Sequence, residues 1–235
     1  MGKRLFLGLV IVLGLAVAAQ AAETQPLQLA LFNPVQMVPE TESIQGLSLA
    51  LLYVVNKDVT GVSLALGVNK ATGNVQGVEW GLANLVDGYV YGWQDGLINS
   101  VGGRFVGLQE AAVNIVKGDF TGVQGGLVNW DEGFVHGLQL GAVNYTIQQF
   151  VGVQAGAVNI AKGELSGIGL GIVNYAEGPV HGFQGGIVNY AAEMHGLQLG
   201  LVNVTDALDG LQIGLVNYNG KKDPMEFMVL VNWSF

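Results

Sequence analysis

The segment Val135-His-Gly-Leu-Gln-Leu-Gly-Ala-Val-Asn-Tyr145 is one copy of a unit that recurs along most of the chain. Its first glycine returns every 14 to 16 residues, and an asparagine usually follows seven residues later. We number the unit from 1 to 15, with Val135 at position 1, the first glycine at position 3 and the asparagine at position 10. Twelve units can be counted between residues 44 and 218, so the chain is a tandem-repeat protein.

Positions 3 to 11 alternate between two sets of residues, which is the period of a β-strand. Odd positions carry glycine, glutamine, glycine, valine and then an aromatic or aliphatic residue, whereas positions 4 and 8 are mostly aliphatic. Two or three glycines in every fifteen residues would destabilise an α-helix too strongly. We therefore expect an all-β fold.

Positions 13 and 14 often hold a pair that ends in glycine, such as Asp87-Gly88 and Glu132-Gly133. A pair of this kind between alternating runs is typical of a β-hairpin, because a type I′ turn needs positive φ angles. We expect Asp131 and Glu132 to be solvated in such a turn. With this turn, odd positions of one strand face odd positions of the next, so each side chain keeps its face.

An antiparallel meander of twelve strands must close on itself or leave free edges. Residues 26–33 and 226–235 also alternate, and they bring the total to about fourteen strands. Only 11% of the residues are charged and the mean hydropathy is +0.43, whereas a soluble domain carries about 25% charged residues. Our first prediction is an up-and-down antiparallel transmembrane β-barrel, which satisfies every backbone polar group in lipid.

A parallel β-solenoid with coils of about 15 residues is the alternative. Identical short units stack naturally in register, and the glutamine and asparagine columns would become ladders that stabilise stacked strands. Against the solenoid, nine alternating residues leave only six in which the chain can turn and return. We therefore place the barrel first.

The first 21 residues predict a secretory signal peptide. Lys3 and Arg4 precede an apolar stretch, and Ala19-Gln20-Ala21 offers a cleavage site. Residues 22–235 are expected to form a single repeat-built β domain. The absence of cysteine excludes disulfides and cysteine-based metal sites. Without Lys3 and Arg4 the chain has 7 basic and 18 acidic residues, a net charge of −11, so we expect no nucleic-acid partner.

In a barrel the odd positions would line the lumen, and the even face would hold an acidic pair, Asp95 and Glu110, side by side at position 6. His136, His181 and His195 all occupy position 2; they would lie apart in a barrel and would stack in a solenoid. No set of nucleophile, base and orienting group can be assembled, so we expect no enzyme, no cofactor and no metal site. The possible lumen lining is Gln94, Gln109, Gln124, Gln139, Gln154, Gln184, Gln198 and Gln212.

The repeated units, together with the opening segment 27–34 and the closing segment 231–235, resemble a family of uncharacterised bacterial surface-repeat proteins. The resemblance covers nearly the whole mature chain and implies an exported envelope protein with no known activity. The last strand ends on Phe235 and resembles the C-terminal signature of outer-membrane barrels, which implies recognition by the outer-membrane assembly machinery.

We therefore expect a location in the outer membrane, with the periplasm or the cell surface as the alternative. The expected partners are membrane lipid and the assembly machinery. The expected function is that of a passive channel or envelope scaffold without catalytic activity. An exported β-solenoid with a surface or adhesive structural role is the alternative.

Overall fold

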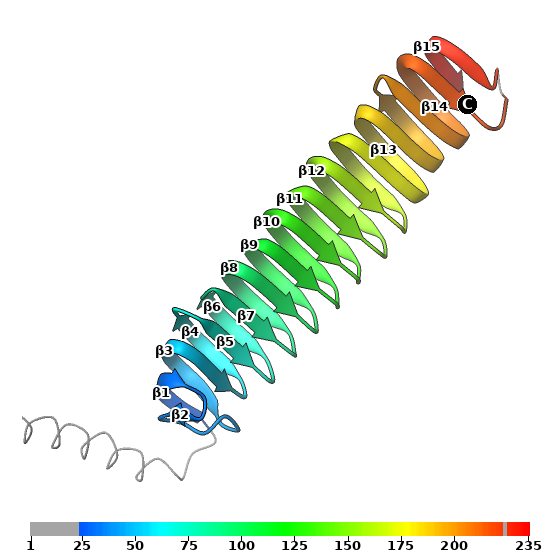
Figure 1. Ribbon diagram of the computed structural model, residues 1–235. Helices are drawn as coiled ribbons and strands as arrows, with labels where there is room; N and C mark the ends of the chain where they lie inside the picture. The colour runs from blue at the N-terminus through cyan, green and yellow to red at the C-terminus, as the bar shows by residue number, and fades with distance from the viewer. Residues whose placement is uncertain (1–23, 223–224) are drawn as a thin grey trace, which may run out of the picture.

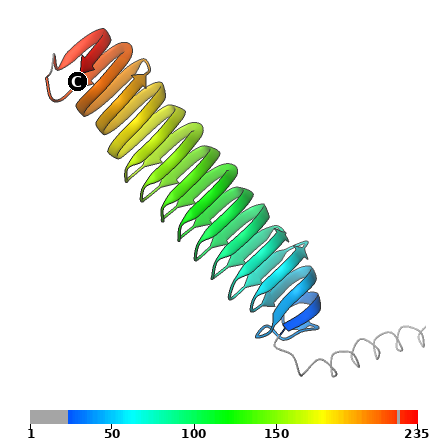
Figure 2. The same ribbon diagram turned by 180° about the vertical axis from the view of Figure 1, so that it is seen from behind.

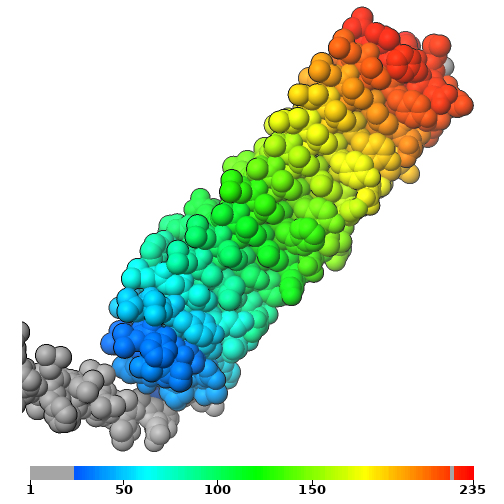
Figure 3. Space-filling model, viewed as in Figure 1, coloured from blue at the N-terminus to red at the C-terminus, as the bar shows by residue number. Residues whose placement is uncertain are grey.

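The computed structural model describes residues 24–222 and 225–235, which form a straight β-solenoid of about 13 turns (Figure 1). The view from behind shows the same regular stack of coils (Figure 2). The space-filling view shows an uninterrupted rod (Figure 3). The predicted signal peptide, residues 1–21, lies outside the described residues.

The described residues form one sheet of fifteen strands, and β13 and β14 continue through turns that separate strands elsewhere. The strands are β1 (Thr24–Phe32), β2 (Val35–Gln36), β3 (Ser43–Asn56), β4 (Val59–Ala65), β5 (Val68–Ala71), β6 (Val75–Trp80), β7 (Ala83–Val86), β8 (Val90–Val101), β9 (Phe105–Val116), β10 (Phe120–Asp131), β11 (Val135–Thr146), β12 (Phe150–Ala161), β13 (Leu165–Leu199), β14 (Val202–Asn219) and β15 (Phe227–Ser234).

Neighbouring repeats run parallel and stack in register, so that Gly122 of β10 pairs with Gly137 of β11 and Gln124 pairs with Gln139. The predicted antiparallel barrel is therefore wrong, and the solenoid alternative is confirmed. Within the described residues, antiparallel pairs occur only at the two ends, between β1 and β2 and between β14 and β15. The pairs at positions 13 and 14 lie in turns between parallel coils and not in hairpins.

The alternation of the repeat breaks at positions 8 and 9, which is why a coil of fifteen residues can close. In β10 the side chains of Phe120, Gln124, Asn129 and Asp131 are buried, which are positions 1, 5, 10 and 12. Two consecutive outward positions mark a bend. The strand is interrupted near this point in two coils, at residues 66–67 between β4 and β5 and at residues 81–82 between β6 and β7. The bend lies within the nine residues that we expected to form one straight strand, so the chain does not have to turn and return in the other six.

Glycine at position 3 allows the coils to approach closely. All twelve of these glycines have φ between +131° and +149°, a region that side-chain-bearing residues rarely adopt. A Cβ atom on Gly137 would lie 1.9 Å from the carbonyl oxygen of Gly122 in the coil before it. The column therefore has to be glycine for both backbone conformation and space.

The interior has a hydrophobic half and an amide half. Positions 1 and 12, next to the turns, hold valine, phenylalanine and alanine side chains in one continuous cluster, in which Phe105 and Phe120 stack with their ring centres 5.3 Å apart. Positions 5 and 10, next to the bend, hold glutamine and asparagine. Because buried amides need partners, the coils above and below must supply them.

Candidate functional site

The eight glutamines predicted to line a lumen lie inside the packed solenoid. Each of them is at most 1% exposed, so they line no open channel. Six of them donate through Nε2 to Oε1 of the glutamine in the preceding coil, at 2.8–3.0 Å, in two runs that end at Gln154 and Gln212. The first glutamine of each run donates elsewhere, Gln94 to Glu79 Oε2 and Gln184 to the Tyr190 carbonyl. The runs are separate because Gly169 occupies position 5 between Gln154 and Gln184. The last Oε1 of each run, on Gln154 and Gln212, has no hydrogen-bond partner.

The asparagines at position 10 form a continuous ladder from Asn69 to Asn217. Each Nδ2 donates to Oδ1 of the asparagine in the next coil, at 2.8–3.1 Å. In ten coils the same nitrogen also donates to a backbone carbonyl of the next coil, at 2.8–3.1 Å. The two ladders therefore donate in opposite directions along the rod.

Two carboxyl groups, those of Glu79 and Asp131, are buried although the sequence did not lead us to expect it. Glu79 takes the position of a ladder glutamine and accepts a hydrogen bond from Gln94 at 2.6 Å; burial raises the pKa of this carboxyl to about 7. Asp131 accepts hydrogen bonds from Gln124 and Gln139, and burial raises its pKa to about 8. The prediction that Asp131 is solvated is wrong.

Both carboxyl groups could have been found from their columns in the repeat. Glu79 replaces glutamine at position 5, and Asp131 stands at position 12, where most repeats have valine, alanine or threonine. A charged residue in such a column is buried where the column faces the interior, as at positions 5 and 12, and lies on the surface where the column faces outward, as Asp95 and Glu110 do at position 6. Both carboxyls lie wholly in the interior and are 0–1% exposed, so we assign them to the core rather than to a reaction site.

The predicted acidic pair lies on the surface of the rod. Asp95 of β8 and Glu110 of β9 are register partners in neighbouring parallel strands. Asp95 is half-buried and Glu110 is exposed. Their arrangement side by side is as expected, but on a solenoid they face outward beside aliphatic rows rather than into lipid at the middle of a barrel wall.

The histidines behave as the solenoid alternative predicts. His181 and His195 stack in neighbouring coils with their ring centres 4.7 Å apart, and His195 Nδ1 lies 3.1 Å from a carboxylate oxygen of Asp209. His136 stands three coils before His181 in the sequence. Within residues 24–222 and 225–235, no group of three or more potential ligands could hold a metal ion.

The bend of every coil presents aliphatic side chains to the outside. We call positions 4, 6, 8 and 9 of the twelve repeats the apolar face. Asp95 and Glu110 are the only charged residues at these positions. The side chains with the largest exposure form a row at position 8, nine of whose members are 48–64% exposed: Leu51, Leu66, Leu82, Leu97, Leu127, Ile172, Ile187, Leu201 and Leu215.

Both end caps continue the apolar face, although their sequences differ from the repeat. In β1, Leu27 and Leu29 pair with Leu47 and Leu49 of the first repeat. In β15, which runs in the opposite direction, Trp233 pairs with Leu211 and Val231 with Ile213, and both cap residues are exposed. Two unrelated segments thus preserve one surface property.

Charge is concentrated on the opposite edge, in the turns at positions 13 to 15. Ten charged residues occupy these positions in the repeats from β6 onward, and Lys162 forms an ion pair with Glu177 of the next coil. These turn residues are Asp87, Arg104, Lys117, Asp119, Glu132, Lys162, Glu164, Glu177, Glu193 and Asp206. The rod is therefore amphipathic across its width.

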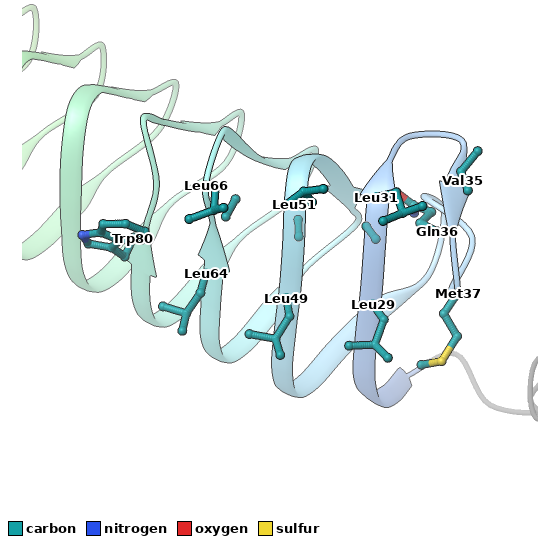
Figure 4. A pocket seen from close by; sticks show the side chains of 13 residues that line it. Leu29, Leu31, Val35, Gln36, Met37, Leu49, Leu51, Leu64, Leu66 and Trp80 are labelled. Atoms are coloured by element: carbon teal, nitrogen blue, oxygen red, sulfur yellow. The ribbon is translucent and has the colours of Figure 1, made fainter. Parts of the chain in front are cut away.

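A groove of about 760 Å³ lies at the N-terminal end of the apolar face (Figure 4). Leu29, Leu49 and Leu64 form one wall from position 6 of successive layers. The other wall comes from position 8, where Leu51 and Leu66 follow Leu31. The floor is formed by small side chains, the alanines at position 7. Trp80 and β2 stand at the two ends of the groove.

No protein-family model, no curated protein and no solved structure matches this chain. Among the described residues, no helix is long and apolar enough to cross a membrane. The resemblance to surface-repeat proteins and the reading of the C-terminal strand as an assembly signal stay predictions. In the structure that strand, β15, caps the rod.

Proposed function

We propose that this protein is an exported, non-catalytic scaffold that lies along a membrane surface with its apolar face against the lipid. The continuous apolar face is the observation that carries the proposal. Twelve coils at the spacing of neighbouring strands span about 55 Å, and two packed strand layers are about 10 Å thick, so the bend edge alone offers roughly 550 Å². The largest apolar patch on a typical monomer covers about 300–600 Å² and is often functional; the bend edge alone reaches the upper part of this range, and positions 4 and 6 add to it.

Lipid fits this face better than water because the apolar and charged edges are separated. A surface of this kind binds in the interfacial region of a bilayer, with its apolar side inward and its polar side in water. Aromatic residues at position 11 border the face, where Trp130 stacks on Tyr145 and Tyr175 on Tyr190. Tryptophan and tyrosine favour the membrane–water interface, which supports the same orientation.

Sedimentation with phosphatidylcholine vesicles tests the proposal, because a lipid with no net charge isolates the apolar contribution. Leu127→Glu combined with Ile172→Glu places two carboxylates in the row at position 8 of the apolar face, at side chains that are 64% and 55% exposed. We expect wild-type protein to sediment with the vesicles, and this variant to bind at least about tenfold more weakly because charge in lipid is costly.

The matched control carries the same two charges on the opposite edge, as Gln148→Glu with Gln149→Glu in the turn after β11. This control should bind like the wild type. Wild-type protein that stays in the supernatant, or an equal loss in both variants, would exclude lipid as the partner of the apolar face. Circular dichroism verifies that all three proteins are folded.

A further inference from the structure

We propose that the N-terminal groove binds a single acyl chain of a membrane lipid, held along the axis of the rod. This inference deepens the proposed function and rests on it for the source of the lipid. The groove is the one segment of the apolar face where β2 closes one end and a large side chain, Trp80, stands at the other. Here the aliphatic rows at positions 6 and 8 form its two walls.

The length of the groove fits one lipid tail. Its walls come from four successive layers, β1, β3, β4 and β6, whose three intervals add up to about 15 Å. The hydrocarbon core of a bilayer is about 30 Å thick, so one tail reaches about 15 Å. The layer that follows brings Asp95 to position 6, which ends the aliphatic wall.

The chemistry of the lining favours hydrocarbon over a polypeptide. Its side chains are aliphatic apart from Trp80, Gln36 and the thioether of Met37. The Gln36 amide is already occupied, because Nε2 donates to the carbonyls of Val38 and Val55 and Oε1 accepts from the Val55 amide. A peptide in the groove would bury backbone polar groups without partners, which costs free energy for each group. An acyl chain brings no such groups.

The lining also indicates where the polar end of the ligand lies. The groove has no charged side chain, so the carboxylate of a free fatty acid would find no cation there. The headgroup of a phospholipid can stay in the interfacial region while one tail enters the groove. Because the proposed function places the groove at a bilayer, we assign the acyl chain to a membrane phospholipid.

The first experiment uses dodecyl maltoside, a neutral single-chain probe, below the concentration at which it forms micelles. Trp80 reports binding in a background that carries Trp93→Phe, Trp130→Phe and Trp233→Phe. We expect a saturable change in Trp80 fluorescence with one probe per chain. Leu49→Gln with Leu51→Gln should weaken binding about tenfold or more, because apolar contact of two side chains is lost.

The matched control is Leu199→Gln with Leu201→Gln, which changes the same two positions in a repeat outside the groove. The control should leave probe binding unchanged, whereas both variants should lower vesicle sedimentation to a similar extent. No saturable signal, or equal weakening in the two variants, would overturn the groove assignment. If the wild type bound the probe but did not bind vesicles, the proposed function would be wrong while the assignment of the groove as an acyl-chain site would hold.

Phosphatidylcholine brominated along one acyl chain tests the phospholipid as the source. In vesicles of this lipid, bromine should quench Trp80 more strongly than Trp93, each measured as the single tryptophan of the chain. Trp93 stands at position 4 of the apolar face, outside the groove, and its exposed fraction of 41% is close to the 45% of Trp80. Equal quenching, or stronger quenching of Trp93, would show that no chain enters the groove from the bilayer.

Discussion

The asparagine and glutamine ladders use the same amide chemistry, but only the asparagine ladder continues through every repeat from β5 to β14. Each asparagine amide nitrogen in ten of these coils satisfies two acceptors, a side chain and a backbone carbonyl of the next coil. A glutamine bonds mainly to another glutamine, as Gln139 does to Gln124. The asparagine ladder therefore holds the backbone at the bend as well as linking its own side chains. The gap in the glutamine column, in contrast, leaves only one acceptor unpaired.

The largest expected effect comes from breaking the continuous ladder. Asn144→Ala removes the donor to Asn159 Oδ1 and to the Ala155 carbonyl, and it takes the acceptor from Asn129 Nδ2. Several buried groups without partners, at about 1–3 kcal/mol each, should lower the free energy of unfolding by about 4 kcal/mol. Urea denaturation followed by circular dichroism measures the change.

The matched variant in the other ladder is Gln154→Ala. Gln154 Oε1 already lacks a partner, and only Nε2 bonds, to Gln139 and Thr146. The loss should be about 2 kcal/mol. If Gln154→Ala destabilised the protein as much as Asn144→Ala, the proposed difference between the two columns would be wrong.

The buried acids in the glutamine ladder predict a pH dependence of stability. Burial raises the pKa of Asp131 from 3.8 to about 8, so the folded chain keeps a proton that the unfolded chain releases between these pH values. The free energy of unfolding therefore falls as the pH rises from about 4 to about 8, by up to about 1.4 kcal/mol per pH unit.

The Asp131→Asn substitution should reduce this slope. Between pH 5 and pH 8 the free energy of unfolding of the variant should therefore rise by a few kcal/mol relative to that of the wild type. Glu79 contributes in the same direction up to about pH 7, because burial raises its pKa as well. Glu79→Gln together with Asp131→Asn should flatten the profile further. Unfolding in urea at a series of pH values measures the slopes, and parallel profiles for all three proteins would contradict the buried protonated state.

The smallest expected effect comes from repairing the glutamine ladder. Gly169→Gln can accept from Gln184 and donate to the unpaired Gln154 Oε1, and a Cβ at this position would meet Asn174 Oδ1 at 3.2 Å, so a small shift suffices. We expect a gain of about 1 kcal/mol. Gly167→Ala in the same coil should instead destabilise, because its Cβ would lie 2.0 Å from the Gly152 carbonyl oxygen. A loss of thermal stability in Gly169→Gln would show that the gap is required.

Sequence reasoning found the repeat, the two amide columns and the stacking of His181 on His195 in the solenoid alternative. It missed the bend at positions 8 and 9, although two adjacent aliphatic residues such as Leu127 and Val128 break a strict alternation. It also placed Asp131 in solvent, because the start of the turn cannot be located to one residue from its glycine alone. The exposed apolar face of a rod was not predicted, because the same residues were assigned to the lipid side of a barrel.

The sequence alone determined the β class, the repeat of about fifteen residues and the columns of recurring residues within it. An antiparallel meander pairs odd positions with odd positions, whereas parallel stacking pairs each position with itself, and both arrangements keep a recurring side chain on one face. Local pattern therefore cannot decide between a barrel and a solenoid. The tertiary structure decided it: parallel stacking lets ten asparagine amides reach both a side chain and a backbone carbonyl of the next coil, and the glycines at position 3 permit the close approach that this requires.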